Sequence, residues 1–353
     1  MSGRRHAARL ATGERMVASR VQVCVYIVYR IMLIPRFPQW LPIAAELRDE
    51  LAPRLDSLTD GVSEFTFAGL YLFRDHYDYH VAETSDGHLV ISGQRPDGTF
   101  FSLPEGLPHD DEELLELFER HDYLKNLPPS WVPSGTERLT SLGFEIVPDR
   151  ENFDYLYRAA DLAELPGKRL HKKRNHVNAF LREYESTVRE LDRETEDAAY
   201  TILETWRESR DDDADYREAL EGLREREMLG LEGIVVYVAG TPVAYAMGEP
   251  IGRSGTYVVH VEKALSGYRG LYQYLNKAFA ERIAERYPVI NREQDLGDPG
   301  LRQAKMTYRP YGFVEKHRVV SGVRRPVYAE SDAATHADAA THAAVCCCCG
   351  GDS

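Results

Sequence analysis

Residues 256–283 of the 353-residue chain read TYVVHVEKALSGYRGLYQYLNKAFAERI. The first part, 257–263, is apolar and rich in β-branched residues, which predicts a buried strand. A turn with two glycines follows, and the apolar residues after it recur at every fourth position, as on one face of a helix: Leu271, Leu275, Phe279 and Ile283. Free backbone N–H groups at a helix start attract anions, so we expect a phosphate site at Arg269 and Gly270.

The sequence after this helix predicts another strand, 287–292, which leads into two acidic residues, Glu293 and Asp295. Side chains alternate along a strand, so these carboxylates are expected on the same side. A short helix at 301–308 and a closing strand at 314–320 follow.

The order of strand, Arg-Gly turn, helix, strand, short helix, Gly-Phe and strand resembles the core of GNAT-type acyltransferases. Three short motifs are similar, more narrowly, to the domain that forms the C-terminal part of phosphatidylglycerol lysyltransferases: Tyr-Arg-Gly-Leu-Tyr-Gln at 268–273, Asn-Arg-Glu-Gln-Asp-Leu-Gly at 291–297 and Lys-Arg-Asn-His at 173–176. The resemblance covers residues 37–320. The turn at 266–271 has fewer glycines than that of ordinary acetyltransferases, which counts against acetyl-CoA as the donor.

The first half of the chain has the same order of predicted helices and strands, but its amino-acid sequence is not similar to that of the second half. Its expected helices are 43–55, 63–73 with Ser63 as N-cap, 110–121 and 136–142, and its expected strands are 77–83, 88–94, 99–103, 144–147 and 153–158. In the second half, a hairpin at 234–238 and 243–247 follows a long acidic helical region, 190–226. We therefore expect an α+β fold of tandem GNAT-like domains, each a mixed, mainly antiparallel sheet flanked by helices.

Four segments are expected along the chain. They are an N-terminal extension at 1–36, with translation from near Met32 as an alternative start, an N-terminal domain at 37–160, a C-terminal domain with a basic helix at 161–327, and a disordered tail at 328–353. The tail repeats Asp-Ala-Ala-Thr-His-Ala and holds four consecutive cysteines.

Composition excludes several classes of protein. The net charge of −14 argues against broad non-specific binding to nucleic acid or anionic lipid. Cysteine occurs only at 24 and 346–349, so we expect no disulfide framework and no metal site in the folded part, as in a cytoplasmic protein. The apolar run 21–34 is shorter than the ~20 residues that span a bilayer, which leaves peripheral membrane contact open.

The resemblance implies direct transfer of an acyl group to an amine or hydroxyl. Such a reaction needs a site for the phosphates of the carrier, a base for the acceptor and an acid for the leaving group. Glu262, Glu293 and Asp295 are candidate bases at strand ends, and Tyr308 or Tyr311 is the candidate acid. For each carboxylate, a surface ion pair is an equally good interpretation.

A basic segment lies between the two halves of this acidic protein. Its cations are Lys168, Arg169, Lys172, Lys173, Arg174 and Arg182. In a helix, several of them would lie on adjacent stripes and contact successive phosphates of a polyanionic carrier. The alternative is a solvated helix that offsets the acidic region after it.

Three functions therefore stay open. The resemblance favours a transferase that uses aminoacyl-tRNA, with the acceptor end of the tRNA on the basic helix. An acyl-CoA-dependent transferase is the second, and a non-catalytic binding protein on the same scaffold is the third. No tightly bound cofactor is expected, and the acceptor is not identified by the sequence.

Overall fold

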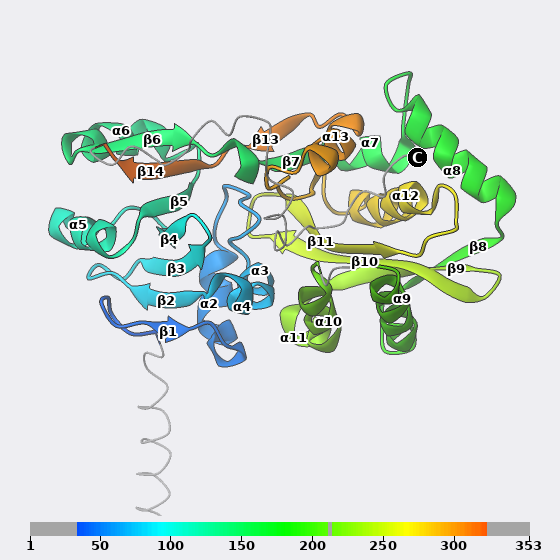
Figure 1. Ribbon diagram of the computed structural model, residues 1–353, viewed down its shortest axis with the longest axis horizontal. Coiled ribbons are helices and arrows are strands. Elements are labelled where there is room, and N and C mark those ends of the chain that lie inside the picture. Colours follow the sequence, from blue (N-terminus) through cyan, green and yellow to red (C-terminus); the bar gives the residue numbers. More distant parts are fainter. Residues whose placement is uncertain (1–33, 211–213, 323–353) are drawn as a thin grey trace, which may run out of the picture.

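The computed structural model describes residues 34–210 and 214–322, so the predictions for residues 1–33 and for the tail at 328–353 lie outside the described residues. Two seven-stranded sheets lie side by side (Figure 1). The first has the order β1-β2-β3-β4-β5-β14-β6, and the second β13-β7-β12-β11-β10-β9-β8. Each contains one parallel pair and is otherwise antiparallel. The predicted α+β architecture with two mainly antiparallel sheets is confirmed.

The first sheet and its helices come mostly from the first half of the chain. Its strands are β1 (Leu41–Pro42), β2 (His80–Glu83), β3 (Leu89–Arg95), β4 (Gly98–Ser102), β5 (Tyr123–Leu127), β6 (Phe144–Pro148) and β14 (His317–Ser321). Its helices are η1 (Ala45–Leu47), α2 (Arg48–Leu55), α3 (Phe67–Leu72), α4 (Arg74–Tyr77), α5 (Asp111–Arg120), α6 (Val132–Ser141) and η2 (Arg150–Asn152).

The second sheet has helices on both faces (Figure 1). Its strands are β7 (Asp154–Arg158), β8 (Ser186–Glu190), β9 (Glu232–Val238), β10 (Thr241–Ile251), β11 (Thr256–Ala264), β12 (Val289–Asn291) and β13 (Gly312–Val314). On one face lie α7 (Ala159–Glu164), α8 (His171–Glu183), α12 (Leu271–Ala284) and α13 (Pro299–Thr307), and on the other α9 (Glu196–Glu208), α10 (Tyr216–Arg224) and α11 (Arg226–Leu229).

The two halves exchange strands. β7, from the first half, lies between β12 and β13 of the second sheet, and β14, at the end of the second half, lies between β5 and β6 of the first. The predicted strand 314–320 is therefore wrong: β13 pairs with β7, whereas β14 pairs with β5 and β6 of the other sheet. Neither sheet is complete without a strand from the other half. The expected division after residue 160 stays a prediction.

One hydrophobic core also crosses between the halves. Phe67 and Leu72 of α3 share a buried cluster with Trp206 of α9, Leu223 of α10 and Met247 of β10. Burial of such side chains is the main stabilising contribution to folding. The exchanged strands and this shared core both join the halves into one unit.

We expect limited proteolysis of the full chain to leave one core that contains both sheets. Cleavage between residues 162 and 169 should be slow, because β7 and α7 are held by the second sheet while the preceding strands belong to the first. Mass spectrometry of the digest measures it. Early release of two separately stable fragments cut between 162 and 169 would contradict a shared unit.

Several local predictions need correction. The helix expected at 63–73 begins only at Phe67, because Thr66 caps it by accepting from the Gly69 N–H at 2.9 Å. The strand expected at 77–83 begins at His80, since α4 runs to Tyr77. The acidic region 190–226 is not one helical segment but includes the separate helices α9 and α10, and the strands β5 and β8 were not predicted.

Candidate active site

The parallel pair β11 and β12 ends where the polar site begins. The two strands pair from Thr256 with Val289 to Val258 with Asn291, after which β11 continues without β12 beside it. Glu293 has φ 52°, in the left-handed region, and its N–H donates to Asn291 Oδ1 at 2.7 Å. The strand therefore stops at Asn291. The predicted alternation that placed Glu293 and Asp295 on one side is wrong.

Arg292 lies at the centre of a buried cluster of polar side chains next to α12. Its Nη2 donates to Glu262 Oε2 at 2.5 Å, and Asn276 of α12 donates to the other oxygen, Oε1, at 2.8 Å. The Tyr308 ring lies against this cluster, with its centroid 5.2 Å from Arg292 Cζ and 4.5 Å from Lys173 Nζ. The structure thus brings together two candidate catalytic residues, Glu262 and Tyr308, with a lysine of the basic segment.

Glu293 belongs to a different group, centred on His260. His260 Nδ1 lies 2.8 Å from Glu293 Oε1, and Nε2 lies 3.0 Å from Glu249 Oε1. Because Met247 pairs with Val261 and Gly248 with Val259, His260 is the extra residue of a β-bulge. Burial disfavours the imidazolium, but hydrogen bonds to the two carboxylates outweigh it and raise the pKa of His260 to about 10.

The raised pKa of His260 predicts how the unfolding free energy depends on pH. The pKa of His260 is raised above the ordinary 6.5, so the charged imidazolium stabilises the folded protein. This contribution to the unfolding free energy is complete below pH 6.5 and is lost as the pH rises through about 10. We expect the difference in unfolding free energy between wild type and His260→Gln to shrink over this window, by at most ~1.4 kcal/mol per pH unit. Denaturant titrations at several pH values measure it.

Lys125 also makes the unfolding free energy depend on pH, in the opposite direction to His260. Taking the difference between wild type and variant removes this contribution, because both proteins contain Lys125. Burial lowers the pKa of Lys125 to about 8, so that lysine titrates in the same window in both proteins. A difference between wild type and His260→Gln that is constant from about pH 6 to about pH 10 would refute the charged state of His260.

Asp295 is fully engaged as an acceptor. It receives hydrogen bonds from Arg302 Nε and Nη2 at 2.9 and 2.8 Å, from the Tyr155 hydroxyl at 2.5 Å, from the Gly297 N–H at 3.0 Å and from Arg150 at 3.1 Å. Burial alone would raise the pKa of Asp295, but the bonds from Arg302 and Tyr155 outweigh it and hold the pKa below its ordinary value. Such a carboxylate is suited to holding the loop rather than to accepting a proton.

Lys305 also holds this loop, from helix α13, and the sequence analysis did not identify it. It is fully buried in α13, and its Nζ donates to the carbonyl oxygens of Arg292 at 2.7 Å, Glu293 at 3.2 Å and Gln294 at 2.5 Å. No local pattern separates it from an exposed lysine of a short helix. His260, in contrast, lies within the apolar run 257–263, and that position is a signal that could have found it.

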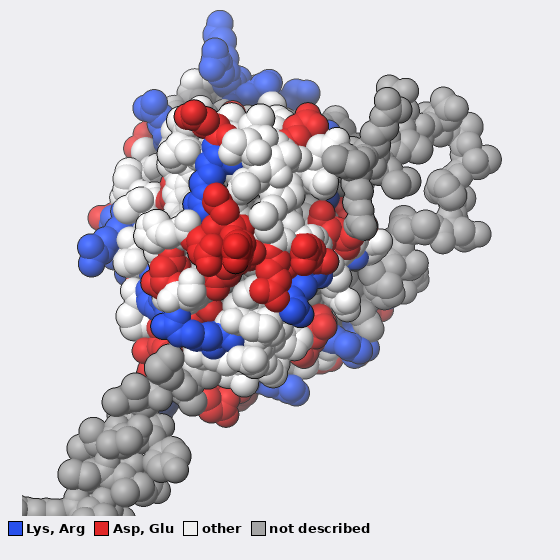
Figure 2. Space-filling model, turned by 90° about the vertical axis from the view of Figure 1, so that its left-hand side faces the viewer, with Lys and Arg blue, Asp and Glu red and all other residues white. Residues whose placement is uncertain are grey.

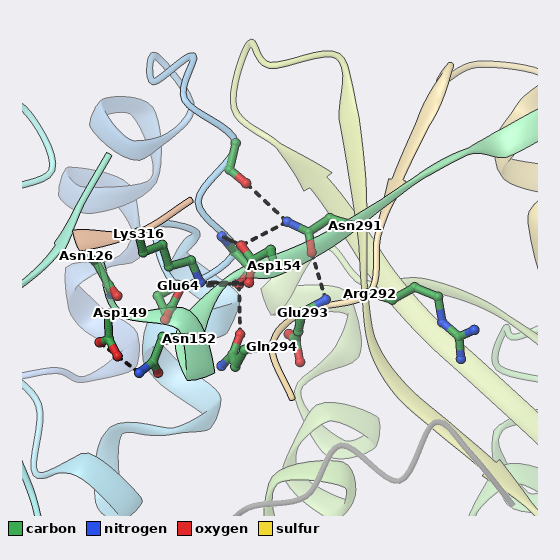
Figure 3. Close-up of polar contacts among 12 residues, drawn as sticks. Glu64, Asn126, Asp149, Asn152, Asp154, Asn291, Arg292, Glu293, Gln294 and Lys316 are labelled. Atoms are coloured by element: carbon green, nitrogen blue, oxygen red, sulfur yellow. Dashed lines mark hydrogen bonds and ion pairs between the residues drawn. The ribbon is translucent and has the colours of Figure 1, made fainter. Parts of the chain in front are cut away.

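A second network of buried charges lies where the exchanged strands cross (Figure 3). Lys316, between β13 and β14, donates to Asp154 of β7 at 2.7 Å and also to Glu64. Asn291 joins this network to the site, because its Nδ2 donates to Asp154 at 3.0 Å. Burial raises the pKa of Glu64, but Lys316 and Lys125 outweigh it and hold that pKa well below its ordinary range.

A small cavity of about 30 Å³ lies between this network and Glu293. Residues of the first half that line it include Ser63, Glu64, Phe73, Tyr77 and Tyr79, and the second half contributes Glu293 and Gln294. Figure 3 shows that Arg292 points away from these last two side chains. The cavity and the Arg292 cluster therefore lie on different sides of the loop after β12.

The expected phosphate site at the start of α12 is partly covered. Gly270 precedes the helix with φ 84°, and a Cβ there would lie 2.3 Å from the carbonyl oxygen of His176 in α8. Phe180 of α8 also stacks on Tyr274 of α12, with centroids 4.6 Å apart. α8 thus packs directly on this helix start, while Arg269 remains exposed.

The basic segment divides into exposed and buried cations. α8 begins at His171, so Lys168 and Arg169 lie in the turn before it, exposed like Lys172. Lys173 is only 6% exposed, and Arg174 donates to the carbonyl oxygens of Leu165 and, at 3.1 Å, of Gly167. Lys173 is therefore not available for the predicted row of phosphate contacts, and the phosphate role of the exposed cations stays a prediction.

Acidic side chains gather at the end of the molecule opposite to α8. Figure 2 shows them near the centre of the end where α5 and α6 lie, and α5 has acidic residues throughout its first turn. α8 lies at the other end in Figure 1.

Over residues 34–210 and 214–322, no group of His, Cys, Asp and Glu side chains is arranged to hold a metal ion. Among the helices in these ranges, none has the length and apolar composition that crossing a membrane requires.

Comparisons with known proteins agree with this architecture. The family model described as "Phosphatidylglycerol lysyltransferase, C-terminal" matches residues 56–320. A solved structure of a conserved protein of unknown function from Bacteroides thetaiotaomicron is 29% identical, with a TM-score of 0.70 over 80% of this chain and 99% of that one. L-PGS from Bacillus licheniformis has a TM-score of 0.56 at 13% identity, over 83% of this chain and 95% of that one, and shows likeness of fold alone. An uncharacterised protein of Mycoplasmoides gallisepticum is 24% identical over 231 residues, which are 60% of this chain and 72% of that protein.

Proposed function

Because the chain belongs to the phosphatidylglycerol lysyltransferase C-terminal family, we propose that it moves an aminoacyl group from aminoacyl-tRNA to an amine or hydroxyl acceptor. The observation that carries the proposal is Glu293, a carboxylate held at the end of the parallel strand pair beside a cavity. Its Oε1 is bound to His260, and its Oε2 has no hydrogen-bond donor among the residues that the structure describes. That oxygen is available to accept a proton from the acceptor.

The other candidate residues take complementary roles in this proposal. Tyr308 stays the candidate acid for the departing ribose oxygen, with the adjacent cations of Arg292 and Lys173 to stabilise negative charge, but it lies across the loop from the cavity, so this role requires the donor ester to reach both sides of the loop. Glu262 positions Arg292, and Asp295 positions the loop that carries Glu293. The donor brings its own activated ester, so the reaction requires no resident cofactor.

The surface around α8 supports a polyanionic donor. Lys168, Arg169, Lys172 and Arg269 are exposed, and none of them forms an ion pair with another described residue. The helix α8 lies at the other end of the molecule from α5 and α6 (Figure 1), and the acidic side chains at the α5 and α6 end (Figure 2) would repel phosphates. The His176 carbonyl beside Gly270 places a negative dipole at the helix start, which counts against a phosphate at Gly270 itself.

Replacing Lys168, Arg169 and Lys172 together with alanine tests this assignment. Stability should change by only ~0.5 kcal/mol per residue, because all three are exposed. Affinity for aminoacyl-tRNA should fall, and the slope of log affinity against log salt should flatten by about 2 if three phosphate contacts are lost.

Titrations of labelled aminoacyl-tRNA over a salt series measure both quantities, with acyl-CoA as the competing ligand. The matched control is Arg189→Ala with Arg193→Ala, which removes exposed cations from another surface. Unchanged affinity and slope in the triple variant, or an equal loss in the control, would rule out this surface as the donor site.

A further inference from the structure

The turn between α13 and β13 carries an exposed aromatic side chain, Tyr311. Tyr311 is 49% exposed, and Met306, in the last turn of α13, is 41% exposed. Among the large apolar and aromatic side chains of the described residues, only Leu115 and Leu181 are exposed to a similar extent. Neither Tyr311 nor Met306 packs against a buried cluster of the described residues. The Tyr311 ring is therefore accessible to another molecule.

The backbone holds this ring in one place. The Tyr311 N–H donates to the carbonyl oxygen of Leu156 in β7 at 2.9 Å, and the next residue, Gly312, pairs with Leu156 in the sheet. Pro310 restricts the backbone directly before the ring. Arg158, the last residue of β7, has its Cζ 5.7 Å from the ring centroid, which is within the range of a cation–π contact. A ring fixed in this way loses little conformational entropy when a ligand stacks on it.

Cations surround the ring. Arg158 and Arg309 are exposed, and neither forms an ion pair with another described residue. Arg309 directly follows Tyr308, and the Tyr308 ring centroid is 4.5 Å from Lys173 Nζ, so this turn meets the start of α8. The helices α7, α8 and α13 lie on one face of the second sheet (Figure 1). The exposed cations around the start of α8 therefore belong to the same surface as Arg158 and Arg309.

The charge on this surface favours a polyanion. Residues 158–172 and 306–315 expose more cations than carboxylates. The exposed cations are Arg158, Lys168, Arg169, Lys172 and Arg309, and the exposed carboxylates are Glu164 and Glu315. These cations come from separate segments of the chain, which matches a strand with several phosphates better than the single nucleotide of CoA. An aromatic ring among such cations is the arrangement that binds unpaired nucleotides, since a base stacks on the ring while the cations contact phosphates.

We propose that Tyr311 stacks on a base in the unpaired 3′ end of the donor RNA, close to the ribose that carries the aminoacyl ester. This assignment rests on the proposed function. Tyr308, the candidate acid for the ribose oxygen, is three residues from Tyr311, which is at most ~11 Å along the chain. A base on Tyr311 and the ester at Tyr308 therefore fit neighbouring nucleotides of one strand. Stacking needs the Tyr311 ring but not its hydroxyl, so this role differs from that of an acid.

Binding of two fluorescent RNA hairpins to the full chain tests the proposal by anisotropy. Both hairpins have the same stem, but one ends in the unpaired sequence CCA and the other is blunt. We expect Tyr311→Leu to weaken binding of the hairpin with the unpaired end at least ~5-fold, as for the loss of one stacked base, and to leave the blunt hairpin unaffected. Tyr311→Phe, which keeps the ring, should bind like wild type. The salt dependence should be unchanged in Tyr311→Leu, because no phosphate contact is lost.

The matched control is Tyr216→Leu. Tyr216 forms another arginine–tyrosine pair, with Arg207 Cζ 4.4 Å from its ring centroid, and lies in α10 on the opposite face of the second sheet (Figure 1). This variant should bind both hairpins like wild type. Thermal unfolding of each variant separates a loss of binding from a loss of folding.

The outcomes separate this inference from the proposed function. Equal affinity of wild type and Tyr311→Leu for the hairpin with the unpaired end overturns the stacking role, even if aminoacyl-tRNA is the donor. An equal loss for the blunt hairpin, or a similar loss in Tyr311→Phe, also overturns it. If wild type binds neither hairpin, the RNA donor and the stacking role both fail, and a parallel titration with CoA shows whether the ring holds adenine instead. A loss confined to the unpaired end supports the stacking role even if no acyl transfer is found.

Discussion

Replacing Lys316 with methionine should lower the free energy of unfolding by ~3–5 kcal/mol, the usual cost of breaking a buried ion pair from one side. Lys316 is fully buried and donates to both Asp154 and Glu64. Without it, two carboxylates face each other where the exchanged strands cross, and only Lys125 remains to balance Glu64. Urea unfolding at neutral pH measures the loss.

Two further variants make that result specific. Lys277→Met is the matched control, because Lys277 pairs with Glu281 on the surface of α12, and its loss should cost under ~1 kcal/mol. Adding Glu64→Gln to Lys316→Met should restore part of the stability, since one of the two unbalanced carboxylates is then neutral. A loss in Lys316→Met no larger than in Lys277→Met would show that the network does not hold the halves together.

Glu293→Gln should lower the rate of acyl transfer by ~100-fold or more, the usual effect of removing a general base. The amide keeps the size of the side chain and one acceptor oxygen for His260 but cannot take up a proton. Asp295 was also a candidate base from the sequence. With five hydrogen bonds to its carboxylate, Asp295 should affect the rate mainly through the position of the loop.

The control for this variant is Glu281→Gln, which alters an exposed carboxylate. Thermal unfolding of both variants separates a catalytic loss from a folding defect. A Glu293→Gln enzyme that is folded and as fast as wild type would remove Glu293 from the mechanism, whatever the donor proves to be.

The elements that the sequence predicted well are those with a strong local period. The strand β11 follows from its apolar, β-branched run, the turn at Gly270 from its glycines, and the helix α12 from apolar residues at every fourth position. The exchange of β7 and β14 could not be predicted in this way. Residues 314–320 look like one strand locally, and only pairing with two different sheets breaks them into two.

The site was predicted in part. Glu262, Glu293 and Tyr308 were named from strand ends and resemblance, and the structure places them around one short loop. The network of Lys316 could not be read from the sequence, because its partners Asp154 and Glu64 lie 162 and 252 residues away. Lys173 was expected on the surface, but α8 turns it toward Tyr308, a contact that depends on how α8 packs on α12.

Donor use is the central claim, and transfer of label from tRNA tests it most directly. Purified protein is mixed with tRNA carrying radiolabelled amino acids, together with n-butylamine and glycerol as amine and hydroxyl acceptors, and a parallel reaction contains labelled acyl-CoA. We predict that label leaves the tRNA at least ~100-fold faster with wild type than with Glu293→Gln, and appears on an acceptor. Label that stays on tRNA as in buffer alone, while acyl-CoA is consumed, would contradict the proposal.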